Sequence, residues 1–267
     1  MHFTDSHCHL DFAAFANQRS QLISECAKAN IHQIIVPAIH PDNWQKVLAL
    51  ASKQHHPGCT IFSCLGIHPW FLQGLTAQHL DNLADAVAAN TQQKGNHIIA
   101  IGETGVDGVM AKQQDNLSQQ LTFFGYQLAL ANQYRLPVIV HHRQSHHYII
   151  PLLKKEKLAA GGIIHAFSGS YQQASDYIDL GFTLGIGGTI TYPRAKKTRD
   201  TIKRLPLSSL VLETDAPAMP VYSKQGQHNS PLHLLTVFDS LVEIRNEEKE
   251  RIAEQVEINV NQCFNLL

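Results

Sequence analysis

Short runs of apolar and often β-branched residues alternate along the chain with longer segments whose apolar residues recur at helical spacing. Such short runs, bounded by Gly and Pro, are typical of buried strands. The predicted strands cover residues 1–7, 31–38, 59–68, 97–103, 136–142, 161–167, 182–188 and 210–215. The amphipathic segments predicted as helices include residues 22–29, 44–52, 80–90, 117–134 and 175–180, and helix is predicted again from about residue 231 onward.

Strand and helix alternate without a low-complexity block or a Ser/Pro-rich linker, so we predict one α/β domain over residues 1–267. Eight strand-helix units in one chain favour a single (β/α)8 TIM barrel. A doubly wound open sheet is the weaker alternative. The length of 267 residues does not decide between them, because it suits one barrel as well as two small domains.

Charge and composition narrow the class of protein. The chain has 21 Lys and Arg against 22 Asp and Glu, so no overall positive field is available for nucleic acid and any polyanion must be held locally. The five cysteines form no CxxC pair, which argues against a disulfide framework or a thiolate zinc cage. The chain starts without a basic and apolar leader and has no run of 18 apolar residues, so we expect a cytoplasmic protein that does not enter a membrane.

His7 and His9 lie two positions apart at the end of the first predicted strand. Side chains at i and i+2 of a strand point to the same face, so the two imidazoles would aim at one point while Cys8 faces away from it. This arrangement suits a metal ion. A pair of surface histidines is the alternative, since the chain has 17 histidines.

Histidines and carboxylates recur at the same relative place in later units, at or just beyond the carboxyl ends of the predicted strands. These residues are His68, Glu103, His141, His165 and Asp215. In a parallel barrel those strand ends share one rim, where catalytic residues gather. The nitrogen and oxygen donors, without a thiolate, suit Zn²⁺, Mn²⁺ or a similar divalent ion. By strand alternation His142 points away from this rim, and the histidine pairs at 55–56 and 146–147 are predicted to be surface residues.

Eight motifs occur in order between residue 5 and about residue 264: DSHCHLDF, GIHPW, GETGVD, LPVIVHHR, IIHAFSG, GIGGTITYP, ETDAP and NQCF. Together they resemble the TatD family of metal-dependent deoxyribonucleases, within the amidohydrolase-like barrels. The resemblance implies a (β/α)8 fold and metal-dependent hydrolysis of phosphodiesters, commonly at DNA ends, although some members act on other substrates. It also implies two metal ions, one held by His7, His9 and Asp215 and the other by His141 and His165, with Glu103 bridging them.

Two segments depart from the family pattern. Asn229-Ser230-Pro231 stands where the family usually has Asn-Glu-Pro, and GVMAKQQ follows GETGVD in place of the usual aromatic and basic residues. We expect both segments on the substrate rim. They therefore bear on the identity of the substrate more than on the metal chemistry.

Two carboxylates are the predicted catalytic residues. Glu103 is the natural bridge between two divalent ions (Mg²⁺, Mn²⁺ or Zn²⁺), because a carboxylate offers one oxygen to each ion and a neutral imidazole has a single free lone pair. Asp215 could both ligate an ion and accept the proton of the attacking water. We expect Asp5, Asp107 and Thr214 to orient imidazoles, although a structural role for each is an equal alternative.

Substrate contacts are predicted from residues near the same rim. Arg143, two positions after His141, could pair with a phosphate, and His68 could donate to another phosphate oxygen. The basic segment at residues 192–204 could contact a DNA backbone or could be a solvated helix face. Three aromatic residues could stack bases, with a core or lid position as the alternative for the last two: Trp70, Phe71 and Tyr192.

Three functions compete at this point. The leading hypothesis is a two-metal phosphodiesterase that trims nucleic acid ends, with DNA ends as the expected substrate and no implied protein partner. A hydrolase of a small-molecule ester, amide or phosphoester on the same barrel is the rival, favoured by the near-neutral charge and by the altered loop at Ser230. A noncatalytic metal-binding protein is disfavoured, because ligands on an open rim leave positions for water whereas structural sites are closed.

Overall fold

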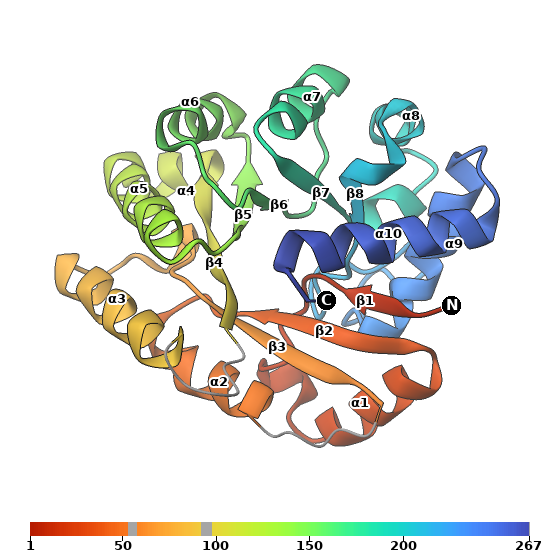
Figure 1. Cartoon of the computed structure of the whole chain (residues 1–267), viewed down its shortest axis with the longest axis horizontal. Coiled ribbons are helices and arrows are strands. Elements are labelled where there is room, and N and C mark those ends of the chain that lie inside the picture. Colours follow the sequence, from red (N-terminus) through yellow and green to blue (C-terminus); the bar gives the residue numbers. More distant parts are fainter. Residues whose placement is uncertain (53–57, 92–97, 267) are drawn as a thin grey trace.

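The computed structural model describes residues 1–52, 58–91 and 98–266. In these residues eight parallel strands pair in chain order, from β1 to β8 (Figure 1). Their bounds are Phe3–Asp5, Ile31–Pro37, Thr60–Leu65, Ile98–Asp107, Val138–Arg143, Gly162–Ile164, Phe182–Ile186 and Leu210–Leu212. The Ser6 N–H donates to the Leu212 carbonyl (3.0 Å) and the Asp215 N–H to the His7 carbonyl (2.8 Å), which joins the first strand to the last. The predicted (β/α)8 barrel is confirmed.

Helices surround the strands on the outside (Figure 1). Helices α1 to α10 span Arg19–Lys28, Trp44–Ser52, Ala77–Thr91, Gly108–Gln114, Leu117–Tyr134, His146–Glu156, Tyr171–Asp179, Lys196–Arg204, Leu234–Ile244 and Lys249–Phe264. Helix α7 begins earlier than predicted, because Ser170 and Gln173 form a capping box: each side chain accepts the backbone N–H of the other. Capping interactions of this kind fix the residue at which a helix begins, and hydrophobic periodicity alone does not predict that residue.

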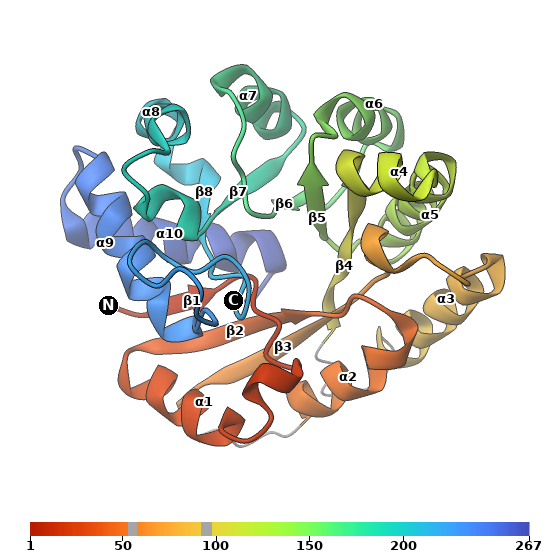
Figure 2. The same cartoon turned by 180° about the vertical axis from the view of Figure 1, so that it is seen from behind.

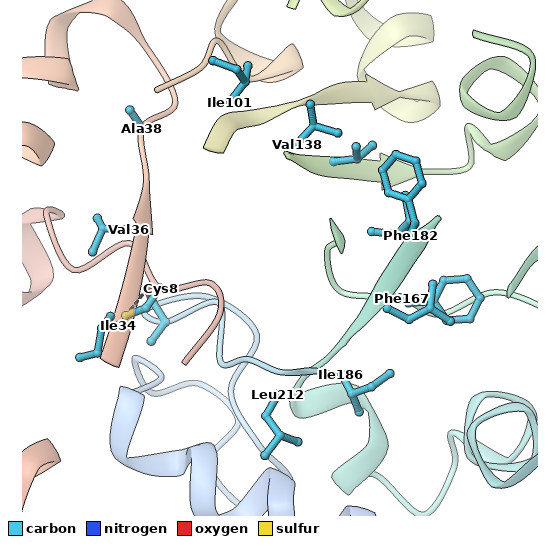
Figure 3. Close-up of a cluster of buried hydrophobic side chains, with 14 of the residues drawn as sticks. Cys8, Ile34, Val36, Ala38, Ile101, Val138, Phe167, Phe182, Ile186 and Leu212 are labelled. Atoms are coloured by element: carbon cyan, nitrogen blue, oxygen red, sulfur yellow. Dashed lines mark hydrogen bonds between the residues drawn. The ribbon is translucent and has the colours of Figure 1, made fainter. Parts of the chain in front are cut away.

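The hydrophobic core has two layers. Alternate residues of each strand face the helices or the barrel interior, as Ile34 and Val36 do on one side of β2 and Ile35 on the other. Cys8 lies in the outer layer beside Ile34 (Figure 3), so the prediction that it faces away from the two histidines is confirmed. Strands buried on both faces explain why the chain reads as continuous apolar runs rather than alternating ones.

Helix α10 closes one end of the barrel. It lies across the front of the barrel in Figure 1, and Figure 2 shows the opposite end. Val260 and Phe264 pack into the inner layer of the core, and burying two such side chains stabilises the fold by roughly 1.5–3 kcal/mol each. The polar residues described below lie at the other end, where the carboxyl ends of the strands meet.

Glu257 of α10 is expected to make stability depend on pH. Its carboxylate accepts the Thr4 N–H and lies 2.9 Å from the Thr4 hydroxyl, and burial raises its pKa from 4.5 to about 7. The unfolded chain releases this proton near pH 4.5 and the folded chain near pH 7, so stability falls as the pH rises through this window. Glu257→Gln cannot titrate, and the metal-free variant should lose about 2 kcal/mol less than the wild-type protein between pH 5 and 8 in urea unfolding.

The matched control for this prediction is Glu254→Gln, which makes the same change at an exposed position of α10. This variant should follow the wild-type pH dependence. Equal pH slopes for Glu257→Gln and the wild-type protein would contradict the assignment.

Several predictions at the edges of elements need correction. Most strands are shorter than predicted, as β1 ends at Asp5 and β8 at Leu212, whereas β4 runs on to Asp107 instead of ending at Glu103. Residues 55, 56 and 97 lie outside the described part of the chain. His147 is exposed as predicted, but His146 is half-buried and its Nδ1 lies 2.8 Å from the Tyr177 hydroxyl. No helix among the described residues is both long enough and apolar enough to cross a bilayer.

Candidate metal centre

His7 and His9 bring two ring nitrogens together just after β1. Their Nε2 atoms lie 3.3 Å apart, and both rings are buried. The strand itself stops at Asp5, so the loop rather than strand pleating produces this convergence. The prediction that His7 and His9 point to one place is therefore correct, but its reason is not, because the strand ends two residues before His7.

Glu103, in the middle of β4, stands between two pairs of imidazoles. Its Oε2 lies 3.2 Å from His7 Nε2 and 3.4 Å from His9 Nε2. Its Oε1 lies 3.2 Å from His68 Nε2 and 3.1 Å from His141 Nδ1. Each carboxylate oxygen thus faces its own pair of nitrogen donors, which is the placement that a bridging ligand needs.

A register irregularity in β4 turns Glu103 toward the site. Ala100 belongs to the inner layer and Ile101 to the outer one, so unbroken alternation would point Glu103 outward with Ile101. The pairing with β5 shifts between Ile101 and Thr104, and such a bulge re-aims the side chains that follow it. At Gly66 of the neighbouring segment a Cβ would come within 2.6 Å of the Gly102 carbonyl carbon, so only glycine allows this close approach.

Asp215 closes the first group of donors. Its Oδ1 lies 3.6 Å from His7 Nε2, 3.5 Å from His9 Nε2 and 3.7 Å from His165 Nε2. Its backbone has a φ of +56°, in the left-handed region that few residues other than Gly, Asn and Asp adopt. Held strain of this kind is common where a side chain must be aimed at a site.

Glu213 is a buried carboxylate to which the sequence analysis gave no role. Its Oε1 lies 2.9 Å from His165 Nδ1 and accepts the Ala166 N–H at 2.6 Å. Gly185 makes room for it, because a Cβ there would stand 2.1 Å from Glu213 Oε2. Strand alternation could have found it: Val211 is in the inner layer, and positions 213 and 215 share its face.

Asp107 contacts His141 from the side opposite Glu103. Its Oδ2 lies 3.2 Å from His141 Nε2 and accepts the Trp70 indole N–H at 2.6 Å. Its Oδ1 accepts the N–H groups of Val109 and Met110, both at 2.8 Å, and so caps α4. Asp107 is thus placed to orient an imidazole, as predicted.

Asp5 and Thr214 have the structural role that was the alternative predicted for them. The Asp5 carboxylate accepts the N–H of His7 (3.3 Å), the N–H of Thr214 (2.9 Å) and the Thr214 hydroxyl (2.6 Å). These bonds tie the loop after β1 to the loop after β8. The two residues hold backbones together rather than imidazoles in these described contacts.

The donor atoms that lie within 4.8 Å of one another form three overlapping groups among the described residues. They are His7, His9 and Glu103; His68, Glu103 and His141; and His7, His165 and Glu213. Five of the six predicted ligands fall in these groups, and the sixth, Asp215, lies within 3.7 Å of nitrogens of His7, His9 and His165. His141 is grouped with His68, for which a substrate contact was predicted, and the sharing of one ion by His141 and His165 stays a prediction. His142 joins none of these groups, but it is among the residues that line the cavity described below, which strand alternation did not predict.

The pKa values of the buried carboxyl and imidazole groups show which of them are ready to bind a cation. Burial opposes ionisation of Glu103, but His68 and His7 outweigh it and hold the pKa of this carboxyl well below its usual range. Burial lowers the pKa of His68 to about 4, so its imidazole is neutral at pH 7. His9 is opposed by burial as well, yet Asp215 and Glu103 raise its pKa to about 10, so a metal ion would displace a proton there.

The residues present fit divalent cations. The donor set is imidazole nitrogen and carboxylate oxygen. Cys8 is not part of it, because its side chain packs in the hydrophobic core. In addition, His7 Nδ1, His9 Nδ1 and Glu213 Oε2 are buried without a hydrogen-bond partner in the described structure. Buried carboxylates and orphaned polar atoms are costly unless a bound group compensates them.

A cavity of about 480 Å³ opens over these donors. Apart from the candidate ligands its wall is mainly apolar and includes Phe12, Ile39, Trp70, Phe71 and Met219. Arg143 is the one Lys or Arg among its described lining residues, and its Nη1 lies 4.0 Å from Asp107 Oδ2. The site therefore joins a cluster of candidate metal ligands to a mainly apolar chamber in which Arg143 is the one described Lys or Arg.

A family model described as "TatD related DNase" matches residues 4–265. The chain belongs to the TatD-related DNase family. It is 40% identical to an "Uncharacterized metal-dependent hydrolase YjjV" of Escherichia coli K12, over 99% of this chain and 98% of the relative. It is 37% identical to an uncharacterized metal-dependent hydrolase of Haemophilus influenzae, over 99% and 100%.

Solved structures agree with this assignment. The crystal structure of the E. coli TatD homologue YjjV matches with a TM-score of 0.91 at 41% identity, covering 98% of each chain. A TatD family hydrolase from Entamoeba histolytica has a TM-score of 0.85 over 99% and 98% of the two chains, and at 19% identity it shows the fold alone. The chain is thus a metal-dependent hydrolase of the TatD family.

The two segments that depart from the TatD pattern do not line the cavity, contrary to the expectation that they form the substrate rim. GVMAKQQ is helix α4, capped by Asp107. Asn229 donates to the carbonyls of Thr214 (2.8 Å) and Met219 (3.1 Å), and Ser230 caps the turn that follows it. Both segments brace the site from outside in the described structure.

The basic segment at residues 192–204 also lies away from the cavity lining. It contains α8, in which Arg199 donates to the Ile190 carbonyl and Arg204 lies 4.1 Å from the centre of the Tyr171 ring. Lys196 and Lys197 are exposed. A DNA contact for these side chains stays a prediction, and the described contacts are those of a solvated helix face.

Proposed function

We propose that this TatD family hydrolase is a phosphodiesterase that removes nucleotides from DNA ends with the help of two divalent cations. The observation that carries the proposal is Glu103, whose two oxygens face separate pairs of imidazoles. The family description supports the substrate, because it names DNases. The relatives reported above support hydrolysis and dependence on metal.

The residues would divide the work as follows. His7, His9, Asp215 and Glu103 would hold one cation, and Glu103 with imidazoles from the His68, His141 and His165 set would hold the other. When bound, divalent cations lower the pKa of water and neutralise negative charge on a phosphoryl oxygen. Asp215 is held ionised at neutral pH, because its histidine neighbours outweigh the effect of burial on its pKa. It can therefore accept the proton of the attacking water.

Arg143 would bind the phosphate. Its guanidinium reaches the cavity and is half-exposed, and only Nη1 contacts Asp107, at 4.0 Å, so its other N–H groups can pair with an anion from the substrate. His68 is less suited to donate to a phosphate than predicted. Its Nδ1 accepts the backbone N–H of Trp70 at 3.1 Å, and its Nε2 faces Glu103. Its neutral imidazole suits a ligand as well as a phosphate contact.

A small-molecule hydrolase is the second candidate. The cavity of about 480 Å³ is of a size that encloses one small ligand, and Arg143 is its single described cation besides histidine. The near-neutral charge of the chain also provides no field that would collect a polymer. A cytoplasmic location and the absence of a protein partner stay predictions.

One experiment separates these functions. Metal-stripped protein is reloaded with Mg²⁺, Mn²⁺ or Zn²⁺ and is offered single-stranded and double-stranded oligonucleotides labelled at either end. A panel of small phosphoesters, esters and amides is tested in parallel. We expect the oligonucleotides to shorten progressively from one end with at least one metal.

The control is Glu103→Ala protein purified in the same way, which exposes any contaminating nuclease. Turnover of the small-molecule panel without any shortening of oligonucleotides would favour the second candidate. No turnover with any metal would leave only metal binding.

A further inference from the structure

Trp70 stands at the mouth of the cavity, directly beside the candidate metal centre. Its ring centre lies 5.3 Å from that of His68 and 5.7 Å from that of His141. The side chain lines the cavity and remains 40% exposed. A large flat surface is thus open to a ligand beside the candidate metal ligands His68 and His141.

The indole is held in a fixed orientation. Its N–H donates to Asp107 Oδ2 at 2.6 Å, and Asp107 is fully buried and bonded to the first N–H groups of α4. The Trp70 backbone N–H donates to His68 Nδ1. A hydrogen bond to a charged acceptor is stronger than a neutral one, so the ring is set before any ligand arrives and a ligand need not order it.

The rest of the chamber limits what this ring can bind. Phe12, Phe71 and Met219 add apolar wall, and Arg143 is the single described Lys or Arg in the lining. An aromatic surface is suited to a flat ring, and one guanidinium is suited to one phosphate. The volume of about 480 Å³ suits a single small unit rather than a run of nucleotides.

We propose that Trp70 is the base-stacking subsite of this cavity, so that one terminal nucleotide is bound with its base against the indole and its phosphate near Arg143. The inference rests on the proposed function and specifies it. Stacking on an aromatic side chain tolerates every base, so the subsite would recognise a nucleotide end without reading its sequence.

Tryptophan fluorescence tests this placement without any turnover. The chain has two tryptophans, and Trp44 is buried with its N–H bonded to the Gly66 carbonyl, which leaves Trp70 as the accessible one. Titration of the metal-loaded protein with deoxyadenosine 5′-monophosphate should quench the fluorescence. Deoxyribose 5-phosphate, which lacks the base, should not quench it.

Variants measure the contribution of the ring by calorimetry. Trp70→Leu should weaken binding of the nucleotide by about 5- to 100-fold and leave binding of the sugar phosphate within about twofold. Trp70→Phe keeps a flat ring and should retain most of the affinity, while the fluorescence response disappears. Tyr222→Ala removes an exposed aromatic residue that does not line the cavity and should change neither.

The proposal is overturned if the nucleotide and the sugar phosphate bind equally well, if Trp70→Leu weakens both alike, or if the nucleotide does not bind at millimolar concentration. If the nucleotide binds more tightly than the sugar phosphate but no phosphodiester is hydrolysed, the proposed function is overturned and the base-stacking role of Trp70 stands. If Trp70→Leu hydrolyses oligonucleotides at the wild-type rate, the proposed function stands and the base-stacking role of Trp70 is overturned.

Discussion

Glu103→Gln is expected to lose most of the bound metal and to lower turnover by about a thousandfold. The amide keeps the size of the side chain but replaces one oxygen by an N–H₂ group that repels a cation, in a position where each oxygen faces two imidazoles. Compensation of charge by a metal ion contributes several kcal/mol to such reactions, and each 1.36 kcal/mol corresponds to a tenfold change in rate. Metal content by mass spectrometry of the dialysed protein and turnover of the best substrate check both parts.

Single histidine variants are compared with Glu103→Ala, which removes both carboxylate oxygens. His9→Ala and His141→Ala each remove one donor from one side of Glu103, so each should cost less metal and less activity than Glu103→Ala. If either histidine variant is the more severe, Glu103 does not link the two groups. Circular dichroism should show an intact barrel in every variant, because these side chains lie at the rim and outside both layers of the hydrophobic core.

Asp215→Asn is expected to lower turnover by about 10²- to 10⁴-fold while the protein keeps its fold, because a positioned base contributes about that factor. Asparagine tolerates the left-handed backbone at this position, where φ is +56°, so the variant should not disturb the loop. Its side chain still offers one oxygen near His7 and His9 but can no longer accept a proton from water. Single-turnover rates at saturating metal separate this loss from weaker metal binding.

The matched control is Glu213→Gln, two residues away in the same segment. Glu213 is fully buried against His165 and does not line the cavity, whereas Asp215 does. Glutamine keeps an oxygen at the 2.9 Å contact with His165 Nδ1, so Glu213→Gln should cost no more than the 10- to 100-fold that loss of a partner of this kind typically costs. An Asp215→Asn protein that binds metal and turns over at the wild-type rate would refute the role of Asp215 as base.

Much of the site was predictable, because the barrel converts chain order into position. Polar residues at the ends of buried strands meet on one rim whatever their separation in sequence, and this placed His7, His141 and Asp215 in one cluster. Alternation also separated Cys8 from its neighbours. The same rule applied beyond β8 would have predicted Glu213, since Val211 faces the barrel interior.

Other contacts could not be predicted in this way. His68 lies three residues beyond β3, in a loop, and its distance from Glu103 depends on how that loop folds. The Trp70 indole reaches Asp107 across 37 positions of sequence, and no periodicity relates the two. The TatD departures at α4 and at Ser230 were expected at the substrate rim, but capping interactions place them outside the cavity.

The sequence by itself determined the eight strand-helix units, the rim at which the ligands gather and the nitrogen and oxygen character of the site, because these follow from hydrophobic period and residue type. The tertiary structure alone decided which donors face one another. Glu103 shows the reason: regular alternation would turn it outward with Ile101, and the irregular pairing of β4 with β5 turns it inward. Register is a property of two paired strands, so one strand's sequence does not contain it.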